Sequence, residues 1–253
     1  MRRRSITEIK EQLSTAETLP DDVRELLQKD TRVGVRRLLE VWQRRRKRQQ
    51  RAIEQFRRLN VFEEKLRAEG YTAVAGIDEA GRGPLAGPVI AAAVMLDPQV
   101  MIPGLNDSKQ LTAARRRLLF GRIKTYAEAF GVGIVQAQEI DRMNIYQAAR
   151  KAMTLAVRRM DRLPDYLLID AMRLDVPMPQ QSLIKGDARS NSVAAASIVA
   201  KVTRDHIMEE LDRRYPGYGF AANKGYGTRQ HLEALRRLGP CPEHRMTFAP
   251  LKS

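Results

Sequence analysis

Gly76-Ile77-Asp78-Glu79-Ala80-Gly81-Arg82-Gly83-Pro84 is the stretch around which the rest of the chain is interpreted. It follows residues 72–75, whose small and β-branched side chains are typical of a buried strand. Successive strand residues point to opposite faces, so Asp78 and Glu79 can serve one site only if the backbone bends there. The glycines that follow make such a bend easy. Arg82 also lies between two glycines, whose backbone amides are not covered by side chains. An arginine beside such amides suits contact with a phosphate or a sugar.

Two other interpretations of this stretch stay open from the local sequence. A strand end followed by two carboxylates and a glycine-rich turn is also common loop chemistry. The spacing of Gly81, Gly83 and Gly87 loosely resembles a dinucleotide-binding loop, but that motif requires a helix to begin at the glycines. Two prolines intervene here, and residues 89–96 are predicted to form a second strand. The strand–turn–strand pattern therefore argues against a dinucleotide fold.

The overall charge indicates a polyanionic partner. The chain has 253 residues and a formal net charge of +15, which favours nucleic acid over a membrane as that partner. No apolar run reaches the roughly 18 residues of a membrane span. No apolar run follows the basic N-terminus, so it is not a secretory signal. The single cysteine, Cys241, excludes an internal disulfide and fits a reducing compartment. We therefore expect a cytoplasmic protein.

The first 70 residues differ from the rest of the chain. They hold 19 Lys and Arg against 12 Asp and Glu, and three helices are predicted there, the last over residues 33–69. The run Arg44–Arg48 within it is either a solvated helix face or a contact to nucleic acid. We expect a basic helical N-terminal extension over 1–70 and a catalytic domain with C-terminal helices over 71–253.

From residue 71 onward, predicted strands and helices share the chain. Strands are predicted near 72–78, 89–96, 130–135, 166–169 and 182–184, and the main helices over 137–160, 190–214 and 228–238. Asp107 or Ser108 is predicted to cap a further helix that carries Leu111 to Ile123. This order predicts an α/β fold, a mixed sheet flanked by helices.

Four carboxylates are candidates for one metal site. Asp78 and Asp170 each end a predicted strand, and ligand sites in α/β sheets favour the carboxyl ends of strands. Glu79 adjoins the first, and Asp187 follows the second by 17 residues. Oxygen-only ligands select Mg²⁺ or Mn²⁺, and two such ions about 3.5–4 Å apart can clamp the attacking water and the leaving oxygen of a phosphodiester. The alternative is that each aspartate is a separate cap or turn residue.

Several motifs, taken together, resemble bacterial ribonuclease HII. They occur in the family's order and are residues 76–89, Asp107-Ser108-Lys109, Leu168-Ile169-Asp170, Lys185-Gly186-Asp187, 194–205, 217–220 and 225–231. The resemblance covers about residues 71 to 245.

The resemblance implies an RNase H-like fold and a divalent-metal-dependent endoribonuclease. Such an enzyme cleaves the RNA strand of RNA–DNA hybrids and incises 5′ to single ribonucleotides embedded in duplex DNA, leaving 3′-OH and 5′-phosphate ends. The implied catalytic residues and metal ligands, for Mn²⁺ or Mg²⁺ in a two-metal mechanism, are Asp78, Glu79, Asp170 and Asp187. The implied substrate-binding residues are Gly81, Arg82, Gly83, Lys109, Lys185 and Tyr226, of which the glycine–arginine–glycine loop reads the ribose 2′-OH and Tyr226 packs on the adjacent sugar. For Lys109 and Lys185 the alternative is a solvated charge.

The expected partners are RNA–DNA hybrids and ribonucleotide-containing duplex DNA, bound by a monomer. Two other functions stay open: a non-catalytic nucleic-acid-binding protein that uses the basic helix, and another two-metal nuclease of the same fold. His206, His231 and Cys241 lack a metal-ligand spacing, and His231 is expected to be structural.

Overall fold

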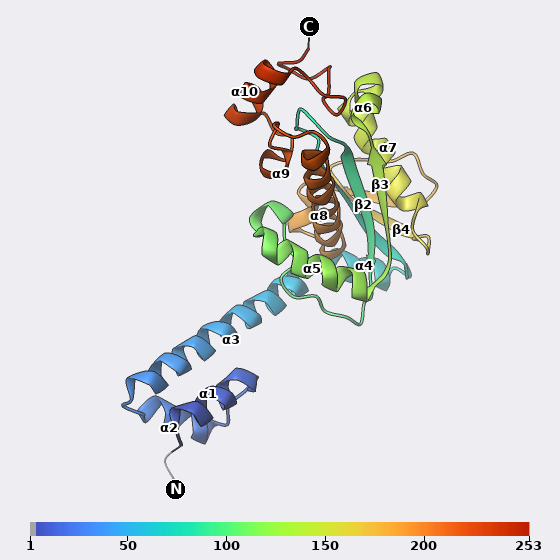
Figure 1. Ribbon diagram of the computed structural model, residues 1–253. Coiled ribbons are helices and arrows are strands. Elements are labelled where there is room, and N and C mark those ends of the chain that lie inside the picture. The colour runs from blue at the N-terminus through green and yellow to red at the C-terminus, as the bar shows by residue number, and fades with distance from the viewer. Residues whose placement is uncertain (1–3, 253) are drawn as a thin grey trace. The chain divides into compact units, whose positions relative to one another are not determined.

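The computed structural model describes residues 4–252, which separate into two compact units between Gln55 and Phe56. The helices, labelled in Figure 1, are α1 (Ile6–Thr15), α2 (Asp21–Lys29), α3 (Val33–Leu59), α4 (Val61–Ala68), α5 (Ala113–Tyr126), α6 (Ala137–Met143), α7 (Ile145–Arg158), α8 (Asn191–Arg214), α9 (Phe220–Asn223) and α10 (Arg229–Leu238). The strands are β1 (Val74–Ala80), β2 (Val89–Leu96), β3 (Ala127–Val135), β4 (Tyr166–Asp170) and β5 (Gln180–Leu183). No helix within the described range has the length and hydropathy that a membrane crossing requires.

The first unit has a small core of its own. Its buried apolar residues are Ile9, Leu13, Leu19, Leu27, Val35, Leu39 and Trp42. Ser5 and Glu8 form a reciprocal capping box that starts α1, because each side chain accepts a hydrogen bond from the other residue's backbone amide. The Trp42 indole donates to the Ala16 carbonyl at 3.0 Å, which ties α3 to the end of α1.

The second unit is built on a five-stranded mixed sheet in the order β3-β2-β1-β4-β5. β1 pairs antiparallel with β2 and parallel with β4, so β1 and β4 end at the same edge of the sheet. Ile77 lies opposite Ile169 in this register, which sets Asp78 beside Asp170. The predicted α/β fold is confirmed, and the position of the candidate carboxylates follows from the parallel β1–β4 pair.

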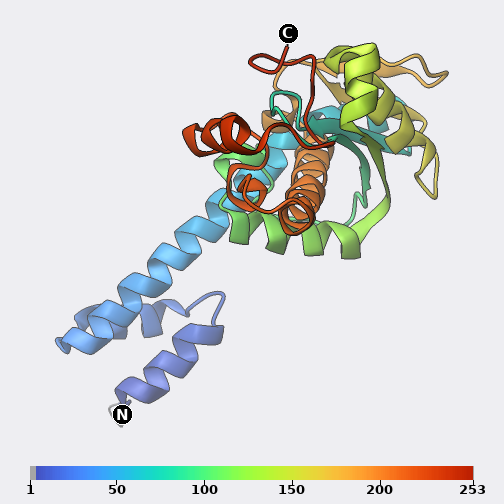
Figure 2. The same ribbon diagram turned by 45° about the horizontal axis from the view of Figure 1, so that its top comes forward.

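Helices cover both faces of this sheet. α7 packs on β2 and β3, while α8 packs on β1 and β2 with α5 beside it, and Figure 2 shows these helices on opposite sides of the strands. The side chains of β2 alternate between the two cores: Ala91, Ala93 and Met95 join the α7 side, and Ala92, Val94 and Leu96 join the α8 side. A sheet buried on both faces explains why this strand is apolar throughout.

Two glycines let helices approach the sheet closely. A Cβ on Gly76 would lie 2.0 Å from the Ser192 carbonyl carbon of α8, and one on Gly133 would lie 1.9 Å from the Ala152 oxygen of α7. Both positions therefore require a residue without a side chain. The first of these contacts holds the start of α8 against β1, two residues before Asp78.

Three boundaries differ from the sequence-based expectation. The helix expected over 33–69 is two helices that meet at Asn60, and the one expected over 137–160 breaks at Asn144, whose φ is +73°. The Asn144 side chain accepts from the Gln147 amide and so caps the start of α7 at this break. Asp107 caps a 3₁₀ turn at Ser108–Gln110, and Thr112 caps α5 in its place.

The boundary between the two compact units also lies before residue 70 in the sequence. Phe56 is buried in the core on the α8 side of the sheet, and Leu66 joins a cluster with Val74 and Leu168. Residues 56–68 are therefore packed as part of the second unit. Apolar periodicity alone predicts a helix in this region, but it does not show which core the helix joins.

Candidate active site

Three carboxylates meet where β1 and β4 end. Asp78, Glu79 and Asp170 each offer a carboxylate oxygen, and these atoms lie within 4.8 Å of one another. Asp78 and Glu79 both belong to β1, so strand alternation alone would separate them. The Asp78 carboxylate accepts a hydrogen bond from the Glu79 amide at 2.7 Å, which turns it along the strand, and the longer Glu79 side chain reaches the same place.

Burial and nearby negative charge make Asp78 and Glu79 hard to ionise. Burial, and then the charges of Glu79 and Asp170, raise the pKa of Asp78 well above its usual value, although the Ser197 hydroxyl and the Glu79 amide oppose this. Burial also raises the pKa of Glu79, against the neighbouring Arg82 guanidinium, which lies 3.3 Å from Glu79 Oε1. A bound cation would relieve this repulsion.

One oxygen in the cluster has no hydrogen-bond partner among residues 4–252. Glu79 Oε2 is buried and makes no hydrogen bond, whereas Glu79 Oε1 contacts Arg82. A buried carboxylate oxygen without a donor is costly unless a cation or another donor binds it. With three carboxylates and no sulfur or nitrogen ligand in the group, the donor set suits a hard ion such as Mg²⁺ or Mn²⁺.

Asp187 lies beside this cluster and is not one of its three mutually close members. It is buried in the 3₁₀ turn Gly186–Ala188, and burial, then Asp107 and Asp170, raise its pKa to about 6. The amide of Gly186 donates to Asp170 Oδ1 at 2.6 Å, which fixes this turn against the end of β4. Asp107 is thus a neighbour of the site, whereas from the sequence it was expected as a helix cap within the motif Asp107-Ser108-Lys109.

A cavity of about 420 Å³ opens beside the carboxylates. Its lining brings together most of the predicted site with residues that were not predicted: Glu79, Ala80, Gly81, Arg82, Gly83, Ser108, Lys109, Asp170, Ser197, Lys201, Arg204 and Tyr226. Burial opposes the charge of Lys109, but Asp107, Asp78, Asp187 and Asp170 together raise its pKa. Lys185 is exposed in a left-handed conformation and does not line this cavity.

Two buried arginines brace the loop that carries Arg82. Arg245, fully buried, donates to the carbonyl oxygens of Gly81, Arg82 and Gly87 at 2.6–3.0 Å. Arg204 donates to the carbonyls of Ala86, Pro88 and Lys224 at 2.8–3.0 Å. Neither arginine is expected to be buried from the sequence, because a charged side chain is ordinarily found at the surface. Their local sequence carries no signal of burial.

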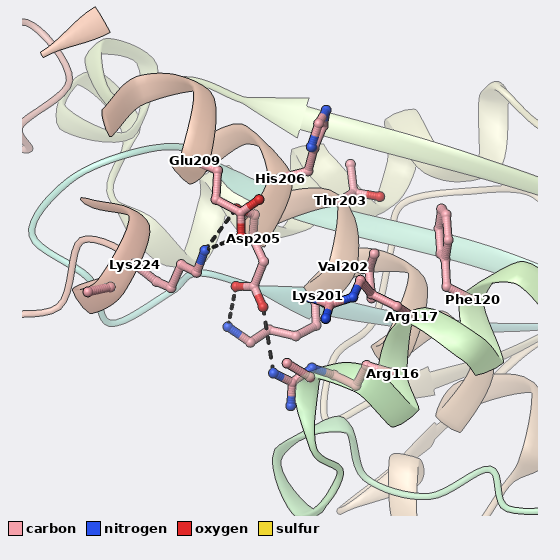
Figure 3. Close-up of a pocket in the computed structure, with 12 residues that line it drawn as sticks. Arg116, Arg117, Phe120, Lys201, Val202, Thr203, Asp205, His206, Glu209 and Lys224 are labelled. Atoms are coloured by element: carbon pink, nitrogen blue, oxygen red, sulfur yellow. Dashed lines mark hydrogen bonds and ion pairs between the residues drawn. The ribbon is translucent and has the colours of Figure 1, made fainter. Parts of the chain in front are cut away.

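A second cavity, of about 670 Å³, lies between α5 and α8. Figure 3 shows Lys201 and Arg116 pointing at the Asp205 carboxylate, and Lys224 pointing at Glu209. Lys201 lines both cavities, so its ion pair with Asp205 fixes a wall that they share.

Comparisons with known proteins identify the family. A family model described as Ribonuclease HII matches residues 75–251, and one described as Ribonuclease HII N-terminal domain matches residues 5–67. This chain belongs to the ribonuclease HII family. It is therefore an endonuclease of the ribonuclease H class, from a family that acts on RNA–DNA hybrids. Family membership rules out the non-catalytic alternative and favours this activity over other nucleases of the same fold.

The sequence relative matches the whole chain, whereas the two solved structures align with 71% of it. The ribonuclease HII of Enterococcus faecalis is 51% identical over 252 residues, which are 100% of this chain and 99% of the relative. The structure of ribonuclease H2 from Pyrococcus horikoshii OT3 aligns with a TM-score of 0.62 at 28% identity, over 71% of this chain and 95% of that one. Bst-RNase HIII in complex with Mn²⁺ has the same fold, with a TM-score of 0.54 at 21% identity over 71% of this chain and 68% of that one.

Proposed function

We propose that this enzyme incises duplex DNA 5′ to a single embedded ribonucleotide, and cleaves the RNA strand of hybrids, to leave 3′-OH and 5′-phosphate ends. The observation that carries the proposal is one cavity in which the carboxylates Glu79 and Asp170, the loop Gly81–Gly83 and Tyr226 meet. A phosphodiester beside the carboxylates would thus lie within reach of groups suited to read the neighbouring sugar.

We propose Mn²⁺ or Mg²⁺ as the cofactor, held by Asp78, Glu79, Asp170 and Asp187. The raised pKa values of Asp78 and Glu79 and the unpartnered Glu79 Oε2 support this assignment. When bound, two such ions would supply charge stabilisation for the phosphodiester and a more acidic water. The protein's part is to fix the carboxylates, through the Glu79 amide on Asp78 and the Gly186 amide on Asp170. The Mn²⁺ bound by Bst-RNase HIII agrees with this choice of ion.

We propose that the loop and Tyr226 recognise the ribose. A 2′-OH both donates and accepts a hydrogen bond, and the backbone of Gly81–Gly83 offers both kinds of group with no side chain at either glycine. The Tyr226 ring lies near Gly83, because a Cβ on that glycine would be 3.7 Å from Tyr226 Cε1. Lys109 and Lys185 are assigned to phosphates, the first from the cavity wall and the second from the exposed turn before Asp187.

We propose that the enzyme acts as a monomer, since one chain supplies the carboxylates, the loop and Tyr226. We propose the cytoplasm as its location, because a single cysteine fits a reducing compartment.

The test of the proposed function is incision of a DNA duplex with one ribonucleotide, in Mn²⁺, in Mg²⁺ and in EDTA. We expect cleavage in either metal, a product 3′ end that a DNA polymerase extends and a downstream 5′ end that DNA ligase seals. Equal cleavage of the all-DNA duplex, or cleavage in EDTA, would contradict the proposal.

A further inference from the structure

Two buried histidines lie outside the carboxylate cavity and close to it. His231 on α10 and His244 in the segment after α10 are 0% and 2% exposed, and their Nε2 atoms are 3.0 Å apart. The rings of Tyr218 and Phe220 pack around both, with centroids 5.0–6.4 Å away. Burial lowers the pKa of each histidine, that of His244 to about 4, so both are neutral at neutral pH.

The hydrogen bonds of this pair fix the proton on each ring. His244 Nδ1 lies 2.9 Å from the Cys241 amide and 3.2 Å from the Cys241 carbonyl oxygen. Because His231 Nδ1 faces a carbonyl and must donate, its Nε2 accepts, so neutral His244 accepts through Nδ1 from the Cys241 amide. His244 Nε2 then carries the proton and donates to His231 Nε2. His231 Nδ1 carries the remaining proton and donates to the Tyr226 carbonyl at 2.8 Å. The four groups form a chain with one direction, which we call the histidine chain: Cys241 N–H, His244, His231 and Tyr226 C=O.

The histidine chain ends at the backbone carbonyl of Tyr226, the residue assigned to sugar recognition. Tyr226 is about half exposed, lines the carboxylate cavity and lies between two glycines. Gly225 has a φ of +83° and packs on the Ala86 carbonyl, its amide donates to Asn223 Oδ1, and its carbonyl accepts from the Leu85 amide. The Tyr226 carbonyl accepts from His231 and from the Thr228 amide, its amide donates to the Asn223 carbonyl, and these bonds hold its backbone.

The other end of the histidine chain, at His244, lies next to the residues that hold the Arg82 loop. His244 forms a β-bridge with Ala86, and the next residue is Arg245, whose guanidinium binds the carbonyls of Gly81 and Arg82. One short segment, residues 241–245, thus holds the loop directly and Tyr226 through the histidines. This common support adds to the direct hydrogen bond from the Leu85 amide to the Gly225 carbonyl, and both bear on the spacing between Tyr226 and Gly83.

We propose that His231 and His244 are positioning residues for ribonucleotide recognition, which hold the Tyr226 ring at a fixed place against the Gly81–Gly83 loop. The proposal rests on the proposed function of Tyr226. It assigns to the pair a role in selecting a single ribonucleotide, and no contact with the reacting phosphodiester.

The test uses two amide substitutions at each histidine. Asn places an amide nitrogen near the histidine Nδ1 position, whereas Gln places its amide near the Nε2 position. At residue 231, Asn keeps the donor to Tyr226 and Gln loses it. At residue 244, Gln keeps the donor to His231 and Asn loses it.

We expect opposite preferences at the two positions. His231→Gln and His244→Asn should lower kcat/KM for a duplex with one ribonucleotide about tenfold more than His231→Asn and His244→Gln do. Cleavage of a long hybrid should change less than threefold in all four, because a hybrid offers many docking positions. If residue 231 variants do not fold, the pair at residue 244 decides alone. The same amide preferred at both positions, or equal losses on the two substrates, would overturn the proposal.

Double substitution separates this proposal from the function proposed for Tyr226. Tyr226→Ala should weaken single-ribonucleotide incision more than hybrid cleavage, and His231→Gln added to it should cause no further loss. Unchanged selectivity in Tyr226→Ala would refute the role of Tyr226 itself, and the present proposal with it. A multiplicative further loss in the double variant would overturn only the histidine role.

The ring protonation can be measured without activity. Long-range ¹H–¹⁵N NMR spectra of the full-length protein distinguish the two neutral forms of histidine. We expect the proton on Nδ1 of His231 and on Nε2 of His244. The reverse pattern, or a charged ring at pH 7, would overturn the proposal.

Discussion

Asp78 is buried beside two other carboxylates, and this burial, with Glu79 and Asp170, raises its pKa well above the usual value. The pKa is then higher in the folded than in the unfolded chain, so the charged form destabilises the fold above the folded pKa. Stability returns as the pH falls through that value. Asp187, with a pKa of about 6, shifts in the same direction. In the metal-free protein, lowering the pH from about 7.5 toward 5.5 should therefore reduce the destabilisation from this site.

Asp78→Asn should stabilise the metal-free protein at pH 7.5. The amide oxygen can still accept from the Glu79 amide, while the buried charge is gone. We expect a Tm higher by about 2–4 °C in EDTA, as about 1 kcal/mol produces in a domain of this size, and a smaller difference at pH 5.5. Mn²⁺ should raise the Tm of the wild type only. Asp161→Asn, which changes an exposed carboxylate, is the control, and a lower Tm for Asp78→Asn would contradict the prediction.

Asp170→Asn should abolish cleavage and leave duplex binding intact, and Asp78→Asn should do the same. The asparagine oxygen can still accept from the Gly186 amide, so the turn that holds Asp187 stays in place. Loss of a metal ligand should lower kcat by roughly 10³-fold or more, because several kcal/mol of charge stabilisation are lost. Asp107→Asn changes a neighbouring carboxylate outside the close cluster and should lose less than about tenfold. Near-wild-type turnover by Asp170→Asn would remove Asp170 from the site.

At the level of elements, α4 supports the start of α8. Glu63 is 1% exposed, and its Oε1 accepts from the Ser190 hydroxyl at 2.6 Å and from the Ser192 amide at 2.9 Å. A carboxylate at a helix N-terminus satisfies free amides and complements the helix dipole. This contact matters for the site because Ser192 packs on Gly76 of β1, two residues before Asp78.

Glu63→Ala should destabilise the second unit by about 2–3 kcal/mol, because it leaves the buried Ser192 amide without an acceptor. Calorimetry should show a Tm lower by several degrees. Fluorescence of Trp42, the only tryptophan, reports the first unit and should change little. Glu64→Ala, one residue on and exposed, should cost less than about 0.5 kcal/mol. Equal effects of the two substitutions would show that Glu63 does not support α8.

The point at which the chain can be shortened follows from the same packing. Residues 56–253 keep Phe56, Glu63 and Leu66, whereas a chain that begins at Gly70 lacks all three. We expect residues 56–253 to unfold close to the temperature of this unit in the full chain and to retain cleavage. Residues 70–253 should unfold at least 5 °C lower, since each lost buried side chain costs about 2–5 kcal/mol. Equal Tm values would place the functional boundary near residue 70.

At the scale of the whole molecule, α3 carries the exposed positive charge of the first unit that could contact nucleic acid. Arg45 is not available to a ligand, because it donates to the carbonyls of Leu13, Ser14 and Ala16 at the end of α1. Three exposed cations, Lys47, Arg48 and Arg51, share one face of the helix, since residues three and four apart are neighbours on its surface. We call them the α3 basic face.

Replacing the α3 basic face with serines should weaken binding to an uncleavable hybrid and flatten its salt dependence. Each phosphate contact contributes about −0.9 to the log–log slope on B-DNA, so two or three lost contacts should reduce the slope by roughly two. The control exchanges the same residues as Lys47→Arg, Arg48→Lys and Arg51→Lys, which keeps the charges. An unchanged slope in the serine variant would show that this face is only solvated.

Much of the candidate site was predictable because the residues assigned to it are adjacent in the sequence. Asp78, Glu79 and the Gly81–Gly83 loop form one short stretch, and Asp170 ends an apolar strand. Helix starts at Ser5, Ser190 and Thr228 were also predictable, because a capping hydroxyl acts on amides two or three residues away. These features depend on contacts between residues that are close in the sequence, so they can be predicted from it.

Only the tertiary structure decided which distant groups meet. It selects Asp170 over Asp187 as the third member of the close cluster, through the parallel pairing of β1 with β4. It buries Arg245, which is 164 residues from its partner Gly81 in the sequence. It also pairs His231 with His244, although neither has a recognisable ligand spacing. Local periodicity reports which side of an element is buried, whereas the partner on that side depends on how the whole chain packs.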